Sequence, residues 1–267
     1  ACLVGSEMCI RDRLGDADHL GIHQSCKATC FPTAVGMAVS WNTELIEQIG
    51  ECLGEEAASL GVNVLLGPGL NIKRNPLCGR SFEYFSEDPY LSGKLAAAYI
   101  RGVQRKGVAA CPKHFAVNSQ ENLRMVNNSI VDERTLHEIY LTGFEIAVKE
   151  GSPQAIMTSY NKINGIYSNE NRELLMDILR RQWKFQGAVI TDWGGSNDHV
   201  EGVRAGSSIE MPGTGGDSDR QLLEAVKRKD IEEKVIDQRA SEMLKLIEEA
   251  GNHRKDAYSA VSYTHLT

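Results

Sequence analysis

A carboxylate at the end of a short apolar run is the clearest sign of chemistry in this sequence. Residues 188–191 (Ala-Val-Ile-Thr) have the composition of a buried strand, and Asp192 and Trp193 follow them directly. A carboxylate at the mouth of a buried strand needs a cationic or hydrogen-bonding partner, because an unpaired buried charge is costly. Together with the flat apolar ring of Trp193, it suits a sugar. The alternative is a strand followed by an Asx-type turn, in which Trp193 only packs.

Further candidate residues follow other apolar runs. Lys113 and His114 come directly after residues 108–111 and suit hydrogen bonding and charge stabilisation toward an anionic or hydroxyl-rich ligand. Arg80 lies in a loop with several aromatic and acidic residues, and Tyr160 opens a Tyr-Asn-x-x-Asn-Gly turn. Each has a structural alternative: a salt-bridged Lys, a His satisfied in the core, an Arg paired with the neighbouring acids, and a turn capped by its Asn residues.

The elements that position these residues alternate between strand-like and helix-period segments from about residue 42. Such alternation predicts parallel strands joined by crossover helices. The expected strands are residues 62–66, 108–111, 155–159, 189–191 and 208–211. The expected helices are residues 43–60, 89–106, 132–150, 171–184 and 198–206, followed by a charged amphipathic region at 217–249. Asn42, Pro89 and Gly151 suit helix ends.

The polar groups lie on one side of this pattern. Loops that follow the expected strands are rich in functional groups, whereas the loops from helix back to strand, such as Lys106-Gly107 and Gln186-Gly187, are short and plain. This distribution predicts an α/β fold, a (β/α)8 TIM-barrel-like domain with its site at the C-terminal ends of the strands. A doubly wound sheet is the alternative, although it usually concentrates its ligand groups at one switch point.

Composition excludes several classes of function. The net charge of −7 and the scattered Lys and Arg residues argue against nucleic acid as a partner. No apolar run approaches the roughly 20 residues that a membrane helix needs. Seven irregularly spaced cysteines favour reduced thiols, and hence a cytoplasmic location. No metal-ligand spacing and no phosphate or dinucleotide loop is present, so we expect neither a metal nor a cofactor.

Seven short motifs occur in an order that resembles the N-terminal catalytic domain of glycoside hydrolase family 3, on its β-glucosidase branch. The resemblance covers roughly residues 18–255. The motifs are Gly-Pro-Gly-Leu-Asn-Ile-Lys-Arg-Asn-Pro (67–76), Gly-Arg-Ser-Phe-Glu (79–83), Lys-His-Phe-Ala (113–116), Asn-Ser-Gln-Glu (118–121), Thr-Ser-Tyr-Asn (158–161), Thr-Asp-Trp (191–193) and Glu-Met-Pro-Gly (210–213).

The resemblance implies a retaining glycoside hydrolase that cleaves terminal non-reducing β-D-glucosyl residues, with Asp192 as the nucleophile. A glycosyl-enzyme forms on the nucleophile, and a second carboxyl group protonates the leaving oxygen. Cations around Asp192 predict a low pKa for its carboxyl group. The resemblance also implies a set of sugar ligands and pocket walls: Arg80, Lys113, His114, Arg124, Met157, Tyr160 and Trp193.

The chain departs from the family pattern in two places. The acid/base Glu of the family typically lies in a second, α/β-sandwich domain after the barrel, which we expect to be missing here. The Asp-Gly-Pro-x-Gly-x-Arg motif is not found ahead of Asp18, and we expect the first barrel strand to be missing with it. We therefore expect residues 18–255 to form the barrel domain, preceded by a foreign or irregular segment at 1–17 and followed by a foreign or disordered tail at 256–267.

Several alternatives stay open. A non-catalytic sugar-binding or structural barrel would use the same pocket without turnover, and a Schiff-base enzyme would use Lys113. The sugar is also open: a β-glucoside or oligosaccharide is expected first, while a β-xylosidase-type specificity, arabinose or N-acetylglucosamine are alternatives. The last is less favoured, because the Lys-His-Phe-Pro-Gly-His-Gly loop of the family's N-acetylglucosaminidases does not occur.

Overall fold

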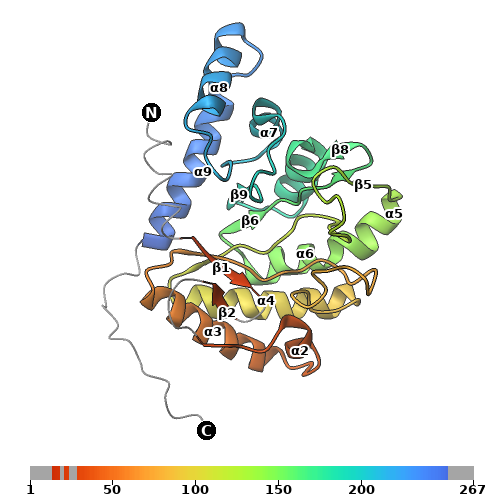
Figure 1. Cartoon of the computed structure of the whole chain (residues 1–267). Helices are drawn as coiled ribbons and strands as arrows, with labels where there is room; N and C mark the ends of the chain where they lie inside the picture. Colours follow the sequence, from red (N-terminus) through yellow and green to blue (C-terminus); the bar gives the residue numbers. More distant parts are fainter. Residues whose placement is uncertain (1–13, 19–20, 24–28, 252–267) are drawn as a thin grey trace.

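The computed structural model describes residues 14–18, 21–23 and 29–251, and its centre is a set of short, mostly parallel strands (Figure 1). One sheet has the order β2-β1-β3-β4, in which only β2 is antiparallel to its neighbour. Strands β6 and β9 form a second parallel pair. Their bounds are β1 Leu14–Asp18, β2 Gly21–His23, β3 Val64–Leu66, β4 Ala109–Ala110, β6 Ala155–Met157 and β9 Ala188–Ile190.

Single parallel bridges connect these groups. Phe115, beyond β4, pairs with Thr158, beyond β6, and Ile190 of β9 pairs with Ile209. The parallel positions therefore follow one another in chain order, from β1 through β3, β4, β6 and β9 to Ile209. This order is that of a (β/α) barrel. A small separate sheet lies among the loops, with the order β5-β7-β8: Asn128–Ser129, Lys162–Ile163 and Ile166–Tyr167.

Helices connect the strands as the sequence predicts. They are α2 Ala34–Ala38, α3 Thr43–Ser59, α4 Pro89–Arg105, α5 Glu133–Thr135, η1 Leu136–Leu141, α6 Thr142–Ile146, η2 Ala147–Gly151, η3 Ser168–Glu170, η4 Glu173–Gln182, α7 His199–Ala205, α8 Asp217–Arg228 and α9 Glu233–Gly251. Side-chain caps determine where several begin: Asn42 accepts the Leu45 N–H at 3.1 Å, and Asp88 accepts the Leu91 N–H at 2.8 Å.

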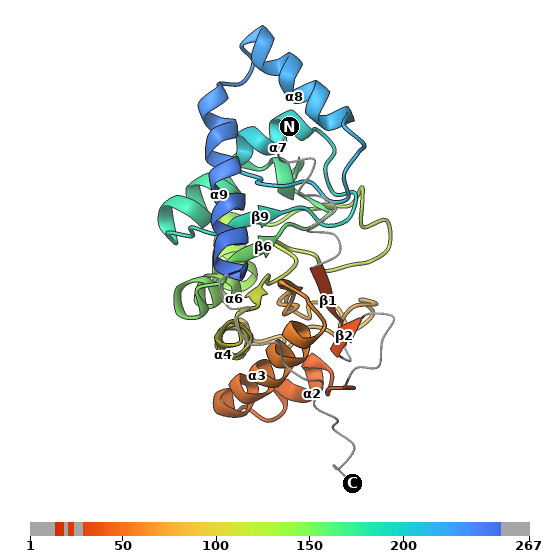
Figure 2. The same cartoon turned by 90° about the vertical axis from the view of Figure 1, so that its left-hand side faces the viewer.

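Strands β3, β4, β6 and β9 bury both of their faces. Leu65, Ala110, Ile156 and Val189 pack with apolar side chains of α3, α4, α6 and η4 in the larger core cluster. Their neighbours along each strand turn to the opposite face, as the two-residue period of a strand requires. There they pack with three side chains of α9: Met243, Leu246 and Ala250. Figure 2 shows α9 running past β9 and β6 on this side. A helix thus shares the face that strand side chains alone fill in a closed barrel.

Strand β1 corrects one expectation. We expected the strand that precedes β3 to be missing and residues 1–17 to lie outside the domain. Instead, Leu14–Asp18 pairs with β3 in parallel, with Leu14 opposite Val64 and Asp16 opposite Leu66. The physical reason is that the exposed edge of β3 offers backbone donors and acceptors that a neighbouring strand satisfies. Residues 1–13 and the whole of the expected tail at 256–267 lie outside the described residues, as do residues 252–255.

None of the helices that the structure describes has both the length and the apolarity needed to cross a bilayer.

Candidate active site

The loops that follow β3 and β4 are aligned by one glycine. Gly69 forms parallel bridges with both Tyr84 and Lys113, which sets the two loops side by side. A Cβ atom at position 69 would lie 2.8 Å from the carbonyl oxygen of Glu83 and 2.9 Å from Cδ1 of Tyr84. Only glycine allows so close an approach of the two backbones. Residues from both loops therefore face the C-terminal ends of β6 and β9.

Asp192 lies two residues after β9 with its side chain 13% exposed. Its Oδ1 accepts the backbone N–H of Trp193 at 2.8 Å, and Nε2 of His114 lies 3.4 Å from its Oδ2. Burial raises the pKa of the Asp192 carboxyl group, against the opposing effects of the Trp193 N–H, Arg80, Tyr160 and Lys113. The expected low pKa was wrong, because desolvation outweighs these partners.

His114 and Lys113 are both buried at the end of β4. The Asn71 side chain holds the backbone of His114 on both sides: its Nδ2 donates to the His114 carbonyl at 2.9 Å, and its Oδ1 accepts the His114 N–H at 2.8 Å. The Lys113-His114 peptide bond is cis. Burial and the positive charges of Arg80, Lys113 and Arg124 hold the pKa of His114 well below its usual range, so the imidazole is neutral.

Two arginines complete the polar side of the site. Nε of Arg80 donates to the buried carboxylate of Glu83. Arg124 donates to Oε2 of Glu121 at 2.6 Å, and its guanidinium lies 4.9 Å from the centre of the Tyr160 ring. These acidic partners hold both guanidinium groups in place while the groups act electrostatically on their surroundings: the charge of each one lowers the pKa of His114.

Tyr160 links the loop after β6 to the loop after β9. Its hydroxyl donates to the carbonyl of Trp193 at 2.8 Å. Burial and the nearby Asp192 carboxylate raise its pKa, so the phenol stays protonated. The side chain of Trp193 is 41% exposed and presents an aromatic face at the rim of the site.

The structure therefore brings together most of the residues that the sequence predicts for the site. Arg80, Lys113, His114, Arg124, Tyr160 and Trp193 interact with Asp192 or with one another, as described above. Met157 is not among them, because it is buried with Ile190 and Met211 in the core cluster that includes the side chains of α9.

Three polar residues near His114 were not predicted: Asn71, Tyr84 and Asn118. Nδ1 of His114 lies 3.1 Å from the Tyr84 hydroxyl, which in turn accepts from Nδ2 of Asn118 at 3.2 Å. Each of the three lies within or beside a motif named above. Their contacts run between loops rather than along one element, so no periodicity in the sequence marks them.

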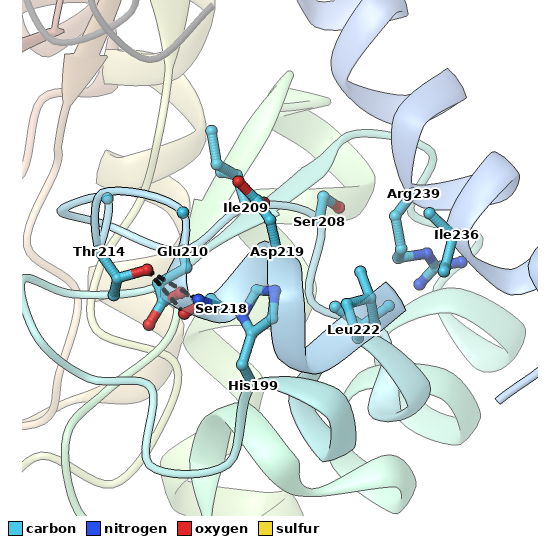
Figure 3. Close-up of a pocket in the computed structure, with 13 residues that line it drawn as sticks. His199, Ser208, Ile209, Glu210, Thr214, Ser218, Asp219, Leu222, Ile236 and Arg239 are labelled. Atoms are coloured by element: carbon cyan, nitrogen blue, oxygen red, sulfur yellow. Dashed lines mark hydrogen bonds and ion pairs between the residues drawn. The ribbon is translucent and has the colours of Figure 1, made fainter. Parts of the chain in front are cut away.

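A separate cavity of about 90 Å3 lies between α7, α8 and α9 (Figure 3). His199 and Ser218 both turn toward Glu210 there, with Nδ1 of His199 3.1 Å from Oε2 of Glu210. Burial would raise the pKa of Glu210, but the nearby polar side chains of His199, Ser218 and Ser196 lower it overall. The cavity is far smaller than the several hundred Å3 typical of ligand pockets, and an ionised Glu210 is a poor proton donor.

Within the described part of the chain, no group of three or more His, Cys, Asp or Glu side chains is arranged to hold a metal ion.

Comparison with known proteins gives a consistent family. The model of the glycosyl hydrolase family 3 N terminal domain matches residues 15–246. The chain is 51% identical over 247 residues to thermostable beta-glucosidase B of Acetivibrio thermocellus, covering 92% of this chain and 33% of that protein. It is 46% identical over 231 residues to an exo-alpha-(1->6)-L-arabinopyranosidase of Bifidobacterium breve, covering 86% and 30%.

A solved structure agrees with the sequence relatives. Beta-glucosidase 3B from Thermotoga neapolitana, in complex with alpha-D-glucose, superposes with a TM-score of 0.85 at 42% identity, covering 92% of this chain and 37% of that one. The expected α/β, barrel-like fold is therefore confirmed. The chain spans about a third of the length of each of these relatives.

Proposed function

The chain belongs to glycosyl hydrolase family 3, and from that membership and the geometry of the site we propose that it is the nucleophile-bearing domain of a retaining β-glucosidase. The observation that supports this most directly is the environment of Asp192. Oδ1 accepts the Trp193 N–H, whereas Oδ2 is buried, has no hydrogen-bond partner within the described residues and lies 3.4 Å from Nε2 of His114. One carboxylate oxygen is thus held by the backbone, and the other keeps its lone pairs unused.

In the proposed reaction, a carboxylate oxygen of Asp192 attacks the anomeric carbon of the sugar. A C–O bond forms between them, the bond to the aglycone oxygen breaks, and its electron pair leaves with that oxygen. Arg80 and Lys113 favour the ionised carboxylate that this attack needs. In this proposal, the imidazole of His114 and the guanidinium of Arg124 bind sugar hydroxyls, and the ring of Trp193 covers one face of the sugar ring.

The proton donor for the leaving oxygen belongs, in this proposal, to the portion of the longer relatives that this chain does not match. Two acidic residues are engaged elsewhere: Glu83 pairs with Arg80, and Glu210 lies in the separate cavity, where its pKa is lowered by His199 and neighbouring hydroxyl groups. An aglycone that leaves readily as an anion needs no protonation. A glycoside with such an aglycone should therefore transfer its sugar to Asp192 without help from an acid/base residue.

The experiment is covalent labelling of the 267-residue chain with a 2-deoxy-2-fluoro-β-glucoside that has a dinitrophenolate leaving group. We expect one sugar per chain, on the peptide that contains Asp192, and no label on Asp192→Asn. Asp177→Asn removes an exposed carboxylate paired with Arg181 and is the matched control, which should label normally. A label on another residue would refute the assignment of the nucleophile. Glucose binding without any label would favour the non-catalytic alternative.

The arabinopyranosidase relative supports a second candidate specificity, toward a pentopyranoside. The 2-deoxy-2-fluoro reagents built on xylose and on L-arabinopyranose distinguish it from glucose. We expect the glucoside to label fastest. Faster labelling by either pentopyranoside would reassign the sugar while leaving Asp192 as the nucleophile.

A further inference from the structure

The proposed function leaves the buried phenol of Tyr84 without a role. Its hydroxyl lies 3.1 Å from Nδ1 of His114 and accepts from Nδ2 of Asn118 at 3.2 Å. Oε1 of Glu121, 3.4 Å from the same amide nitrogen, fixes the orientation of the Asn118 amide, because a carboxylate only accepts. Since Asn118 donates to the phenol oxygen, the hydroxyl proton of Tyr84 is directed to His114.

The protonation states at this contact are set by burial. Burial raises the pKa of Tyr84 well above its usual value, so the hydroxyl keeps its proton. Burial and the surrounding cations lower the pKa of His114 well below its usual value, so its ring has a single N–H. One nitrogen of His114 is therefore a donor and the other an acceptor.

Both sides of the His114 ring favour the same tautomer. If Nδ1 accepts from Tyr84, the ring proton is on Nε2, and Nε2 lies 3.4 Å from Oδ2 of Asp192. The opposite tautomer would turn the lone pair of Nε2 toward a carboxylate oxygen, which is repulsive. The aligned loops make this arrangement possible, because Gly69 brings Tyr84 beside Lys113 and hence beside His114.

We propose that Tyr84 is a positioning residue that holds the ring proton of His114 on Nε2, so that His114 faces Asp192 and its sugar as an N–H donor. This inference rests on the proposed function and deepens it. Donation runs in one direction, from Asn118 to Tyr84 and from Tyr84 to His114, which leaves the N–H of Nε2 facing Oδ2 of Asp192 at 3.4 Å. His114 then selects a ligand that offers an acceptor oxygen at this position.

The direct test is nitrogen NMR of the 267-residue chain labelled with 15N-histidine, because the shifts of the two ring nitrogens identify the tautomer. The His114 signal is assigned by its loss in His114→Gln. We expect His114 to be neutral with its proton on Nε2, and Tyr84→Phe to convert it to a mixture of tautomers. Tyr90→Phe removes the hydroxyl of an exposed tyrosine on α4 and should leave the signal unchanged. A wild-type proton on Nδ1, or no change in Tyr84→Phe, would overturn the proposal.

A second variant and a second measurement extend this test. Asn118→Leu keeps the phenol but frees its hydroxyl to rotate, so it should also mix the tautomers even if Tyr84→Phe does not fold. Labelling of Asp192 by the fluoroglucoside should slow about tenfold in Tyr84→Phe, the effect of losing one hydrogen bond. An unchanged labelling rate alongside an altered tautomer would refute the link to the reaction. Absence of label in the wild-type chain would refute the proposed function alone, since the tautomer is measured without substrate.

Discussion

Replacing Glu242 should be the most damaging single substitution at the end of the sheet away from Asp192. The Glu242 carboxylate on α9 receives Arg180 at 2.7 Å on Oε2 and Arg239 at 2.9 Å on Oε1. All three side chains are at most 9% exposed. Ser208 donates to the same carboxylate at 2.6 Å. Glu242→Gln would leave two buried guanidinium groups without a counterion.

The magnitude follows from burial. Removing one partner of a buried ion pair costs about 3–5 kcal/mol, because an uncompensated charge remains in a poorly solvated place. Arg180 keeps hydrogen bonds to the carbonyls of Gly187 and Gly206, whereas Arg239 otherwise has Met176 Sδ at 3.9 Å. The cost therefore falls mainly on Arg239.

Urea unfolding, followed by far-ultraviolet circular dichroism, measures this cost. With a slope of about 3 kcal/mol per molar urea, the midpoint of Glu242→Gln should fall by about 1 to 1.7 M. Glu138→Gln removes one member of an exposed pair with Arg134 and should shift the midpoint by less than about 0.3 M. A Glu242→Gln midpoint as close to wild type as that of Glu138→Gln would refute the reasoning.

Three further predictions concern the active site. Gly69→Ala should lower the unfolding free energy by about 1–3 kcal/mol, because the new Cβ atom would lie 2.9 Å from the Tyr84 ring. The control Gly36→Ala on α2, whose new Cβ would lie 3.4 Å from its nearest neighbour, should cost less than about 0.5 kcal/mol. Equal unfolding midpoints of the two variants in urea would contradict this prediction. The rate at which the fluoroglucoside labels Asp192 should rise with pH as the carboxyl group loses its proton, and the midpoint of this rise should lie above the usual carboxyl pKa of 3.8. A second titration of the rate near pH 6.5 would contradict a neutral His114. Asn71→Ala should cost about 1–3 kcal/mol through two lost hydrogen bonds to the His114 backbone, and an unfolding midpoint equal to wild type would show that this contact is dispensable.

The elements with local causes could be predicted from the sequence. Asn42 and Asp88 cap helices through contacts three residues away, and Pro89 suits a first helical turn, so a short window contains the relevant information. The end of β9 just before Asp192 could also be predicted, because an apolar run followed by a carboxylate is a local pattern. Parallel pairing then places such strand ends at one edge of the sheet.

Features that depend on distant partners could not be predicted in this way. Strand β1 forms because the edge of β3, some fifty residues later in the chain, accepts it. The pKa of Asp192 depends on how completely loops from four strands exclude water, and the pattern of nearby cations gave the wrong direction. The contact of Tyr84 with His114 depends on the alignment of two loops at Gly69.

The position of α9 has a consequence for how this domain can change over time. The helix is anchored through Arg180, whose hydrogen bonds reach the residues just before β9 and before Ile209, at the N-terminal ends of those parallel positions. Asp192 and His114 lie at the C-terminal ends. Because distant sites act additively, the loops around Asp192 can accumulate substitutions that alter what the site binds without weakening the contacts that hold α9. Ligand preference and folding stability can therefore change independently in this domain.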